Sequence, residues 1–134
     1  MVSRVFVDTS ALLALLDRAD PRHEPARAAF ETLADSELMT HGYVVAETIA
    51  VTRRRLGVEG VITLLDDILP VIDVAPVEPA MHVKAQALYR ESLSSGTSFV
   101  DRVSLAVIER DGITSALALD PDLAGPGLTL LPPP

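Results

Sequence analysis

The chain has 134 residues, the length of one ordinary domain, and we expect a single domain over residues 1–134. With no cysteine, disulfides and thiolate zinc sites are excluded, and the longest apolar run, residues 11–16, is far shorter than the roughly 20 residues that a transmembrane helix needs. Because Asp8 interrupts what would be the apolar part of a secretory signal, we expect a cytoplasmic protein. The net charge of −8 is unfavourable for simple electrostatic binding of nucleic acid.

In the first half of the chain, short runs rich in apolar residues alternate with longer helical patterns. Residues 2–7 are rich in Val and Phe and lead directly into Asp8-Thr9-Ser10, a run of helix-capping residue types, which predicts a buried strand entering a helix. In chain order the predicted elements are a strand at 2–7, helices at 11–16 and 24–34, a strand at 37–40, a helix at 43–56 stopped by Gly57, and a helix at 59–69.

The second half continues the alternation, with a strand at 71–74, helices at 78–93 and 100–110, and strands at 116–119 and 128–131. Short apolar strands that alternate with helices are typical of an α/β fold whose sheet is covered on both faces. We therefore predict a three-layer α/β/α sandwich with a mostly parallel sheet of roughly five strands. Sheets of this kind bind ligands beyond the carboxyl ends of their strands.

Two acidic residues follow predicted strands directly. Asp8 follows the first strand and Asp120 follows the strand at 116–119, so both are placed to reach the ligand-binding edge of a parallel sheet. Each also has a purely structural explanation. Asp is a preferred helix cap, which explains Asp8, and turn chemistry explains Asp120 and Asp122 on either side of Pro121.

Glu47 is the most informative single residue. Its neighbours one helical turn away on either side, Tyr43, Val44, Ala50 and Val51, are apolar or aromatic, which places a carboxylate in the middle of an apolar stripe. A buried carboxylate must be neutralised, paired with Arg or bound to a metal. Alternatively, part of this helix face is an opening rather than core.

Asp101 has the strongest structural explanation, because Ser98-Phe99-Val100-Asp101 matches a capping box at the start of a helix. Capping and metal binding are compatible, since one carboxylate has two oxygens. Taken together, the four acids come from separate segments, as a site for a hard cation requires. Oxygen-only ligands suit Mg²⁺ or Mn²⁺ rather than zinc, and a bound cation reverses the local charge and attracts phosphate.

The basic residues and histidines give weaker signals. Residues 53–55 are three consecutive arginines, and Arg102 and Arg110 lie on a later predicted helix, from which they could meet a nucleic-acid backbone. The helix dipole alone also favours arginines at a helix C-terminus. The histidines, at positions 23, 41 and 82, show no metal or triad spacing, and we expect them at the surface.

These segments together resemble the PIN-domain ribonucleases, and among them the small VapC-type toxins of bacterial toxin–antitoxin pairs. The similarity covers essentially the whole chain and is carried by residues 5–12, Ala46-Glu47, residues 98–101 and residues 119–123. The resemblance implies that Ser10 supports Asp8 and that Asp122 is an auxiliary acid. It also implies that Mg²⁺, or Mn²⁺ in its place, is held by an acidic quartet: Asp8, Glu47, Asp101 and Asp120.

The resemblance further implies hydrolysis of RNA phosphodiester bonds, a homodimer, and an antitoxin that inserts a segment near the site. The sequence departs from the family pattern in two places. Ala118 stands where the family usually has Thr or Ser, and Leu123 stands where an aromatic residue is common. The alternative from another class is a non-catalytic PIN-like module that binds RNA or protein, and Ala118 keeps this alternative open.

Overall fold

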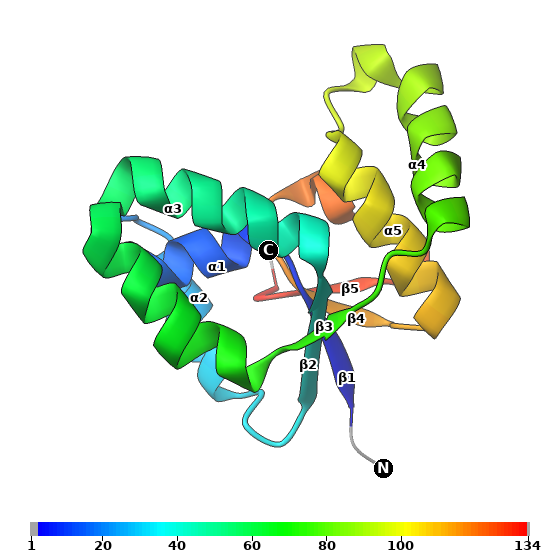
Figure 1. Cartoon of the computed structure of the whole chain (residues 1–134). Coiled ribbons are helices and arrows are strands. Elements are labelled where there is room, and N and C mark those ends of the chain that lie inside the picture. The colour runs from blue at the N-terminus through cyan, green and yellow to red at the C-terminus, as the bar shows by residue number, and fades with distance from the viewer. Residues whose placement is uncertain (1–2, 134) are drawn as a thin grey trace.

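Strand β1 (Arg4–Val7) lies at the centre of the sheet, where its apolar residues are buried on both faces. The computed structural model describes residues 3–133, in which five strands pair in the order β3-β2-β1-β4-β5, and every pairing is parallel (Figure 1). The predicted parallel sheet of about five strands is confirmed. The other strands are β2 (Glu37–His41), β3 (Asp73–Ala75), β4 (Ser115–Leu117) and β5 (Thr129–Leu131).

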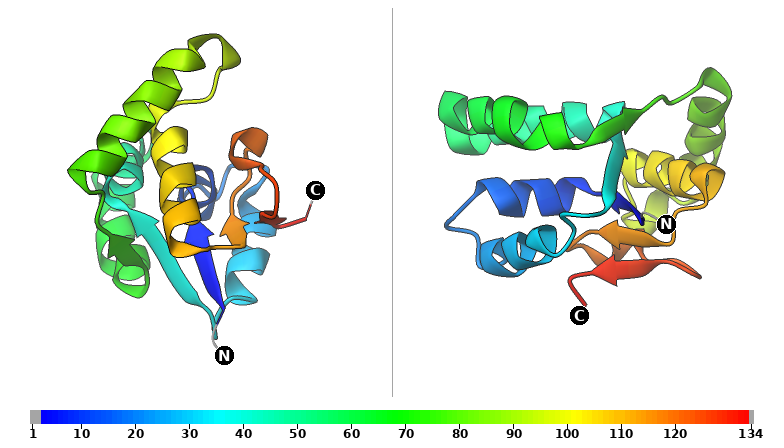
Figure 2. Two further views of the ribbon diagram at one scale, coloured as in Figure 1. Left: turned by 90° about the vertical axis from the view of Figure 1, so that its right-hand side faces the viewer. Right: turned by 90° about the horizontal axis from the view of Figure 1, so that it is seen from below.

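The helices form the two outer layers of the predicted sandwich. Seen from below, the helices that follow β1 and β2 lie on one side of the strands, and those that follow β3 lie on the other (Figure 2). The first group is α1 (Thr9–Leu16), α2 (His23–Glu31) and α3 (Gly42–Thr63); the second is α4 (Pro79–Glu91) and α5 (Phe99–Asp111). The chain therefore moves from β1 outward through β2 to β3, and crosses back over the other face to β4. This reversal creates a topological switch point between β1 and β4.

Helix α3 bends where the sequence predicts a helix break. Gly57 has φ 72° and ψ −162°, which a residue with a Cβ atom rarely adopts, and helical residues continue on both sides of it. A π-helical turn (Leu64–Ile68) and a 3₁₀ turn (Leu69–Val71) follow before β3. Because the 3₁₀ turn includes Val71, the predicted strand at 71–74 begins two residues later, at Asp73.

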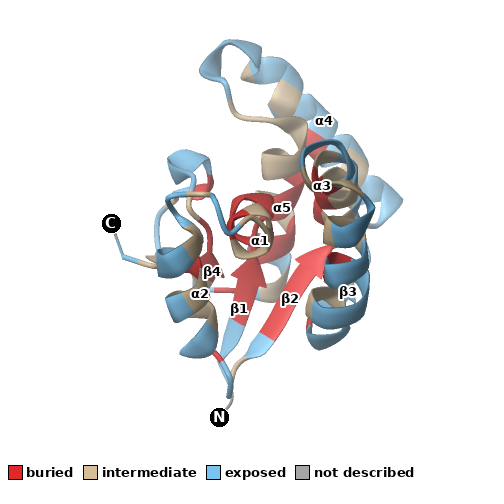
Figure 3. Ribbon diagram, turned by 90° about the vertical axis from the view of Figure 1, so that its left-hand side faces the viewer, coloured by how far each residue is buried: buried red, intermediate tan, exposed pale blue. Residues whose placement is uncertain are grey.

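The core lies between the sheet and the helices that cover it. Figure 3 shows buried residues concentrated along β1 and β2 and on α1 and α5. Phe6 on β1, Leu12 on α1, Val103 on α5 and Leu117 on β4 are all fully buried. Within residues 3–133, no helix is both long enough and apolar enough to cross a membrane.

His41 contradicts the expectation that the histidines lie at the surface, because it is fully buried at the end of β2. Its Nδ1 accepts hydrogen bonds from the backbone N–H groups of Tyr43 (3.1 Å) and Val44 (3.4 Å), which caps α3. Nε2 therefore carries the proton and donates to Ser104 Oγ at 2.8 Å. Burial, followed by the positive charge of Arg110, lowers the pKa of His41 to about 4. The imidazole thus serves the fold as a neutral cap.

Candidate active site

A pocket of about 330 Å³ opens beyond the carboxyl ends of β1 and β4, at the switch point of the sheet. Parallel α/β sheets place their ligand sites at this position. All four acids singled out from the sequence line the pocket, although they come from the end of β1, helix α3, the start of α5 and the loop after β4. The acids are Asp8, Glu47, Asp101 and Asp120, and Asp122 and Ser10 also line it.

Asp8 joins the sheet to the pocket. It has extended backbone angles and caps α1, and its Oδ2 accepts hydrogen bonds from the backbone N–H (3.3 Å) and hydroxyl (2.6 Å) of Ser10. Ser10 Oγ in turn accepts from the backbone N–H groups of Leu119 (2.9 Å) and Asp120 (3.4 Å). One buried hydroxyl therefore fixes the end of β1 against the loop that follows β4.

Asp8 is 5% exposed, and this burial is the main cause that raises the pKa of its carboxyl group. The hydrogen bonds from Ser10 act in the opposite direction, and the negative charge of Asp101 raises the pKa further. An ionised Asp8 is therefore unfavourable in this pocket unless a positive charge is near it.

Asp101 forms the predicted capping box. Its backbone N–H donates to Ser98 Oγ (3.1 Å), and its Oδ2 accepts from the Ser98 N–H (3.2 Å). Within residues 3–133, Oδ1 of Asp101 has no hydrogen-bond partner. The capping explanation is confirmed, and because the capping box uses one oxygen, it is compatible with a second role of Asp101 at the pocket that the side chain lines.

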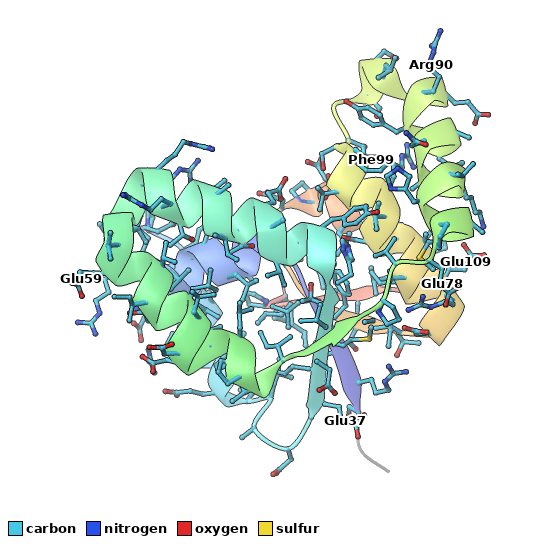
Figure 4. All side chains as sticks on the ribbon, in the orientation of Figure 1. Glu37, Glu59, Glu78, Arg90, Phe99 and Glu109 are labelled. Carbon is cyan, nitrogen blue, oxygen red and sulfur yellow. The ribbon has the colours of Figure 1, made fainter. Side chains whose placement is uncertain are left out.

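An aromatic cluster fixes the start of α5, which carries Asp101. Phe99, labelled in Figure 4, lies at this helix start, and its ring centroid is 5.4 Å from His82 of α4 and 6.0 Å from Tyr43 of α3. Tyr43 Oη also lies 2.7 Å from His82 Nδ1. The cluster ties the starts of α3 and α5 to α4. The sequence did not single it out, because its members come from three separate helices.

Glu47 is half-buried and lines the pocket, so its surroundings differ from the core stripe that its neighbours suggest. The buried side of α3 is formed by Val44, Thr48 and Thr52, whereas Ala50 is exposed and Val51 lines the pocket. The inference that Glu47 lies among core residues is therefore wrong, and the alternative of an opening on this face is correct. Sheet and helices leave this side of α3 uncovered at the pocket.

Asp120 is more exposed than Asp8, with 56% of its side chain accessible, and it pairs with Arg22 (Nη1 to Oδ1, 3.3 Å). Arg22 is a pocket residue that the sequence analysis missed, since it lies in the turn before α2 with no motif around it. Ala118 and Leu123, the two departures from the family pattern, are 3% and 1% exposed. Both positions therefore serve packing in this chain.

The arginines proposed to meet a nucleic-acid backbone separate into two groups. Of the block at 53–55, only Arg55 lines the pocket. Arg102 donates to Ser92 Oγ (3.2 Å), and Arg110 pairs with Asp111 (3.0 Å). Neither Arg102 nor Arg110 lines the acidic pocket, so among these candidates only Arg55 is placed to meet a ligand there.

Taken over residues 3–133, no three side chains of His, Asp or Glu are clustered closely enough to hold a metal ion. The four acids line one pocket without converging on one point. Fold and pocket together define an α/β protein with an acidic pocket at the switch point of its parallel sheet.

Comparison with known proteins identifies the family. Residues 5–126 match the PIN domain, and the chain belongs to the PIN-domain family. It is 30% identical over 130 residues to the 23S rRNA-specific endonuclease VapC20 of Mycobacterium tuberculosis, which covers 96% of this chain and 98% of that protein. It is 36% identical to Ribonuclease VapC26 of the same organism over 64 residues, about half of each chain.

Solved structures support the same relationship. The crystal structure of M. tuberculosis VapC20, described as a sarcin-ricin loop cleaving toxin, matches with a TM-score of 0.81 at 30% identity, covering 89% of this chain and 92% of that one. VapBC2 from Rickettsia felis matches with a TM-score of 0.70 at 14% identity over 95% of this chain and 96% of that one, which shows a shared fold. The resemblance to VapC-type PIN-domain proteins is confirmed.

Proposed function

We propose that the protein is a metal-dependent endoribonuclease that hydrolyses RNA phosphodiester bonds and acts as the toxin of a VapBC-type pair. One observation carries the proposal: four carboxylates from four separate segments line one pocket at the switch point of the sheet. Similarity to the endonuclease VapC20 over nearly the whole of both chains supports it. The substrate is RNA, and the catalytic residues are Asp8, Glu47, Asp101 and Asp120.

The donor chemistry of the pocket suits a divalent cation, although the acids would have to draw together to bind it. All four acids offer oxygen donors, which suit Mg²⁺, with Mn²⁺ able to substitute. A cation would offset both effects that raise the pKa of Asp8, its burial and the charge of Asp101. Thr9 Oγ1 is also buried, lines the pocket and has no hydrogen-bond partner among residues 3–133. A bound cation would lower the pKa of a water molecule and neutralise charge that develops on the phosphate.

The protein's own residues position the acids. Ser10 holds the carboxylate of Asp8 and the backbone at Asp120 in one hydrogen-bonded unit. The capping box orients Asp101 and leaves one of its oxygens for a ligand. Glu47 has no hydrogen bond within residues 3–133, so its longer side chain is able to turn toward the other three. Asp122, also at the pocket, is an auxiliary acid.

Two partners follow from the VapC-like relationship. We propose that the protein is a homodimer and that an antitoxin inserts a segment near the pocket. One structure of similar fold is that of VapBC2 bound to a DNA fragment from their promoter. A non-catalytic PIN-like module that binds RNA or protein is the second candidate function, and the observation that favours it is Ala118 in place of the family's hydroxyl residue.

Cleavage of RNA by the purified protein tests the activity. We expect cleavage that requires Mg²⁺ or Mn²⁺, and a loss on the order of a hundredfold or more in Asp8→Asn. Asp67→Asn is the matched control, since Asp67 is exposed and does not line the pocket. Wild-type rates in a folded Asp8→Asn protein would contradict the mechanism. Lack of cleavage by the wild type over a broad panel of RNAs would favour the non-catalytic module.

A further inference from the structure

Two guanidinium groups share the pocket with the acids. Among residues 3–133, Arg22 and Arg55 are the basic side chains that line it. Arg22 stands at the residue before α2, without a side-chain capping hydrogen bond, and Arg55 lies on α3. Because phosphate contacts come mainly from arginine and lysine, these two side chains are the ones placed to hold an RNA backbone at this pocket.

Arg22 is fixed in place at the border of the pocket. Its Nε lies 3.4 Å from Asp20 Oδ1, its Nη2 lies 3.5 Å from Asp20 Oδ2, and its Nη1 lies 3.3 Å from Asp120 Oδ1. Asp20 Oδ1 also accepts the backbone N–H of Arg22 at 2.8 Å. A guanidinium has five N–H donors, so Arg22 still has donors for a phosphate after it bonds to the two aspartates. Because these bonds already hold the side chain, it loses little entropy when it binds a phosphate.

Arg55 lies close enough to Asp20 for its charge to act on that carboxyl. The pKa of Asp20 is lowered first by hydrogen bonds from Arg22 and also by the charge of Arg55. Asp20 thus lies in the field of both arginines, and its side chain is 17% exposed. The two guanidinium groups therefore lie near one another on the wall of the pocket, both close to Asp20.

Helix α3 links Arg55 to the acids. Glu47, Val51 and Arg55 are spaced four residues apart and all line the pocket, so they share one face of the helix. Eight residues of helix place Arg55 about 12 Å along the axis from Glu47. A single strand of RNA that lies along this face passes the carboxylates at one end and the arginines at the other.

We infer that Arg22 and Arg55 form a phosphate-binding subsite, which holds the RNA backbone beside the scissile bond while the carboxylates act on that bond. The inference rests on the proposed ribonuclease function and adds a binding site to it. Guanidinium groups bind phosphate oxygens through paired hydrogen bonds, which matches this role. Arg53 and Arg54 are exposed and do not line the pocket, so they are outside the subsite.

Binding of a fluorescently labelled single-stranded RNA, followed by anisotropy, tests the subsite. The titrations use full-length protein carrying Asp8→Asn, so that the RNA stays intact in Mg²⁺. Adding Arg55→Gln should weaken binding roughly tenfold, as expected for loss of a hydrogen bond to a charged group. It should also reduce the slope of log affinity against log salt by about 0.7. Arg22→Gln should weaken binding at least as much, because it also exposes Asp120.

Arg54→Gln is the matched control, since it removes the same charge from the neighbouring position of the same helix. Equal weakening by Arg54→Gln and Arg55→Gln would overturn the subsite, as would absence of RNA binding in the Asp8→Asn protein. Thermal unfolding of each variant checks that the fold is kept.

Cleavage by the wild type separates the two proposals. If the wild type cleaves RNA, and Arg55→Gln binds RNA as tightly as the control Arg54→Gln, the subsite is overturned and the ribonuclease stands. If the wild type does not cleave, and Arg22→Gln and Arg55→Gln weaken RNA binding while Arg54→Gln does not, binding of RNA at the subsite is supported and the ribonuclease is overturned.

Discussion

Replacing Asp8 with Asn should stabilise the metal-free protein while abolishing its activity. Asn is also a preferred helix cap, and its side-chain oxygen is able to accept the hydrogen bonds that Ser10 donates to Asp8. The substitution therefore keeps the local contacts and removes one buried negative charge. Because burial and then the charge of Asp101 raise the pKa of Asp8, the ionised carboxylate destabilises the folded state at neutral pH.

The expected gain in the free energy of unfolding comes from removing this buried charge. Single stabilising substitutions commonly add about 0.5–2 kcal/mol to the free energy of unfolding, and we take about 1 kcal/mol for Asp8→Asn. For a chain of this size, that gain raises Tm by about 4 °C. The effect depends on pH, since a protonated Asp8 carries no charge. The difference between the proteins should shrink as pH falls through the raised pKa of Asp8 and vanish below 3.8, the ordinary value for Asp.

Calorimetry in EDTA at neutral pH and below pH 3.8 measures this difference. Adding Mn²⁺ should then reverse the order at neutral pH, because a cation that binds only the folded wild type stabilises it by about 2.7 kcal/mol at a hundredfold excess over Kd. If a folded Asp8→Asn protein proves less stable than the wild type in EDTA at neutral pH, the charge of Asp8 is not the destabilising feature described above.

Ser10→Ala removes the hydroxyl that donates to Asp8 and accepts from the N–H groups of Leu119 and Asp120. The free energy of unfolding, measured in urea, should therefore fall by about 2 kcal/mol. Ser94→Ala at an exposed position is the control, and equal losses in the two variants would contradict this role. His41 has a lowered pKa, so wild-type stability should fall by roughly 3 kcal/mol between pH 6.5 and about 4, where only the unfolded state takes up the proton. His41→Asn should remove this pH dependence. If wild type and His41→Asn give parallel curves of unfolding free energy in urea against pH, His41 is not the group responsible.

The local structure could be read from the sequence because it depends on near neighbours. The Val- and Phe-rich run at 2–7 predicted β1, the spacing of Ser98 and Asp101 predicted the capping box, and Gly57 predicted the break in α3. Each of these features is decided within one or two turns of chain, through backbone geometry and capping hydrogen bonds. Alternation of strands and helices likewise sufficed for the fold class, since a parallel sheet requires crossover helices.

Other features depended on which surfaces the folded elements cover. His41 is buried with a hydrogen bond to Ser104 of α5, and Arg22 bonds to Asp120, and both partners are far away in the sequence. The sequence determined that Glu47 lies on a helix with apolar neighbours. Only the tertiary structure decided that this face of α3 opens onto a pocket, because the strand order places β1 beside β4 and leaves the carboxylates around the switch point between them.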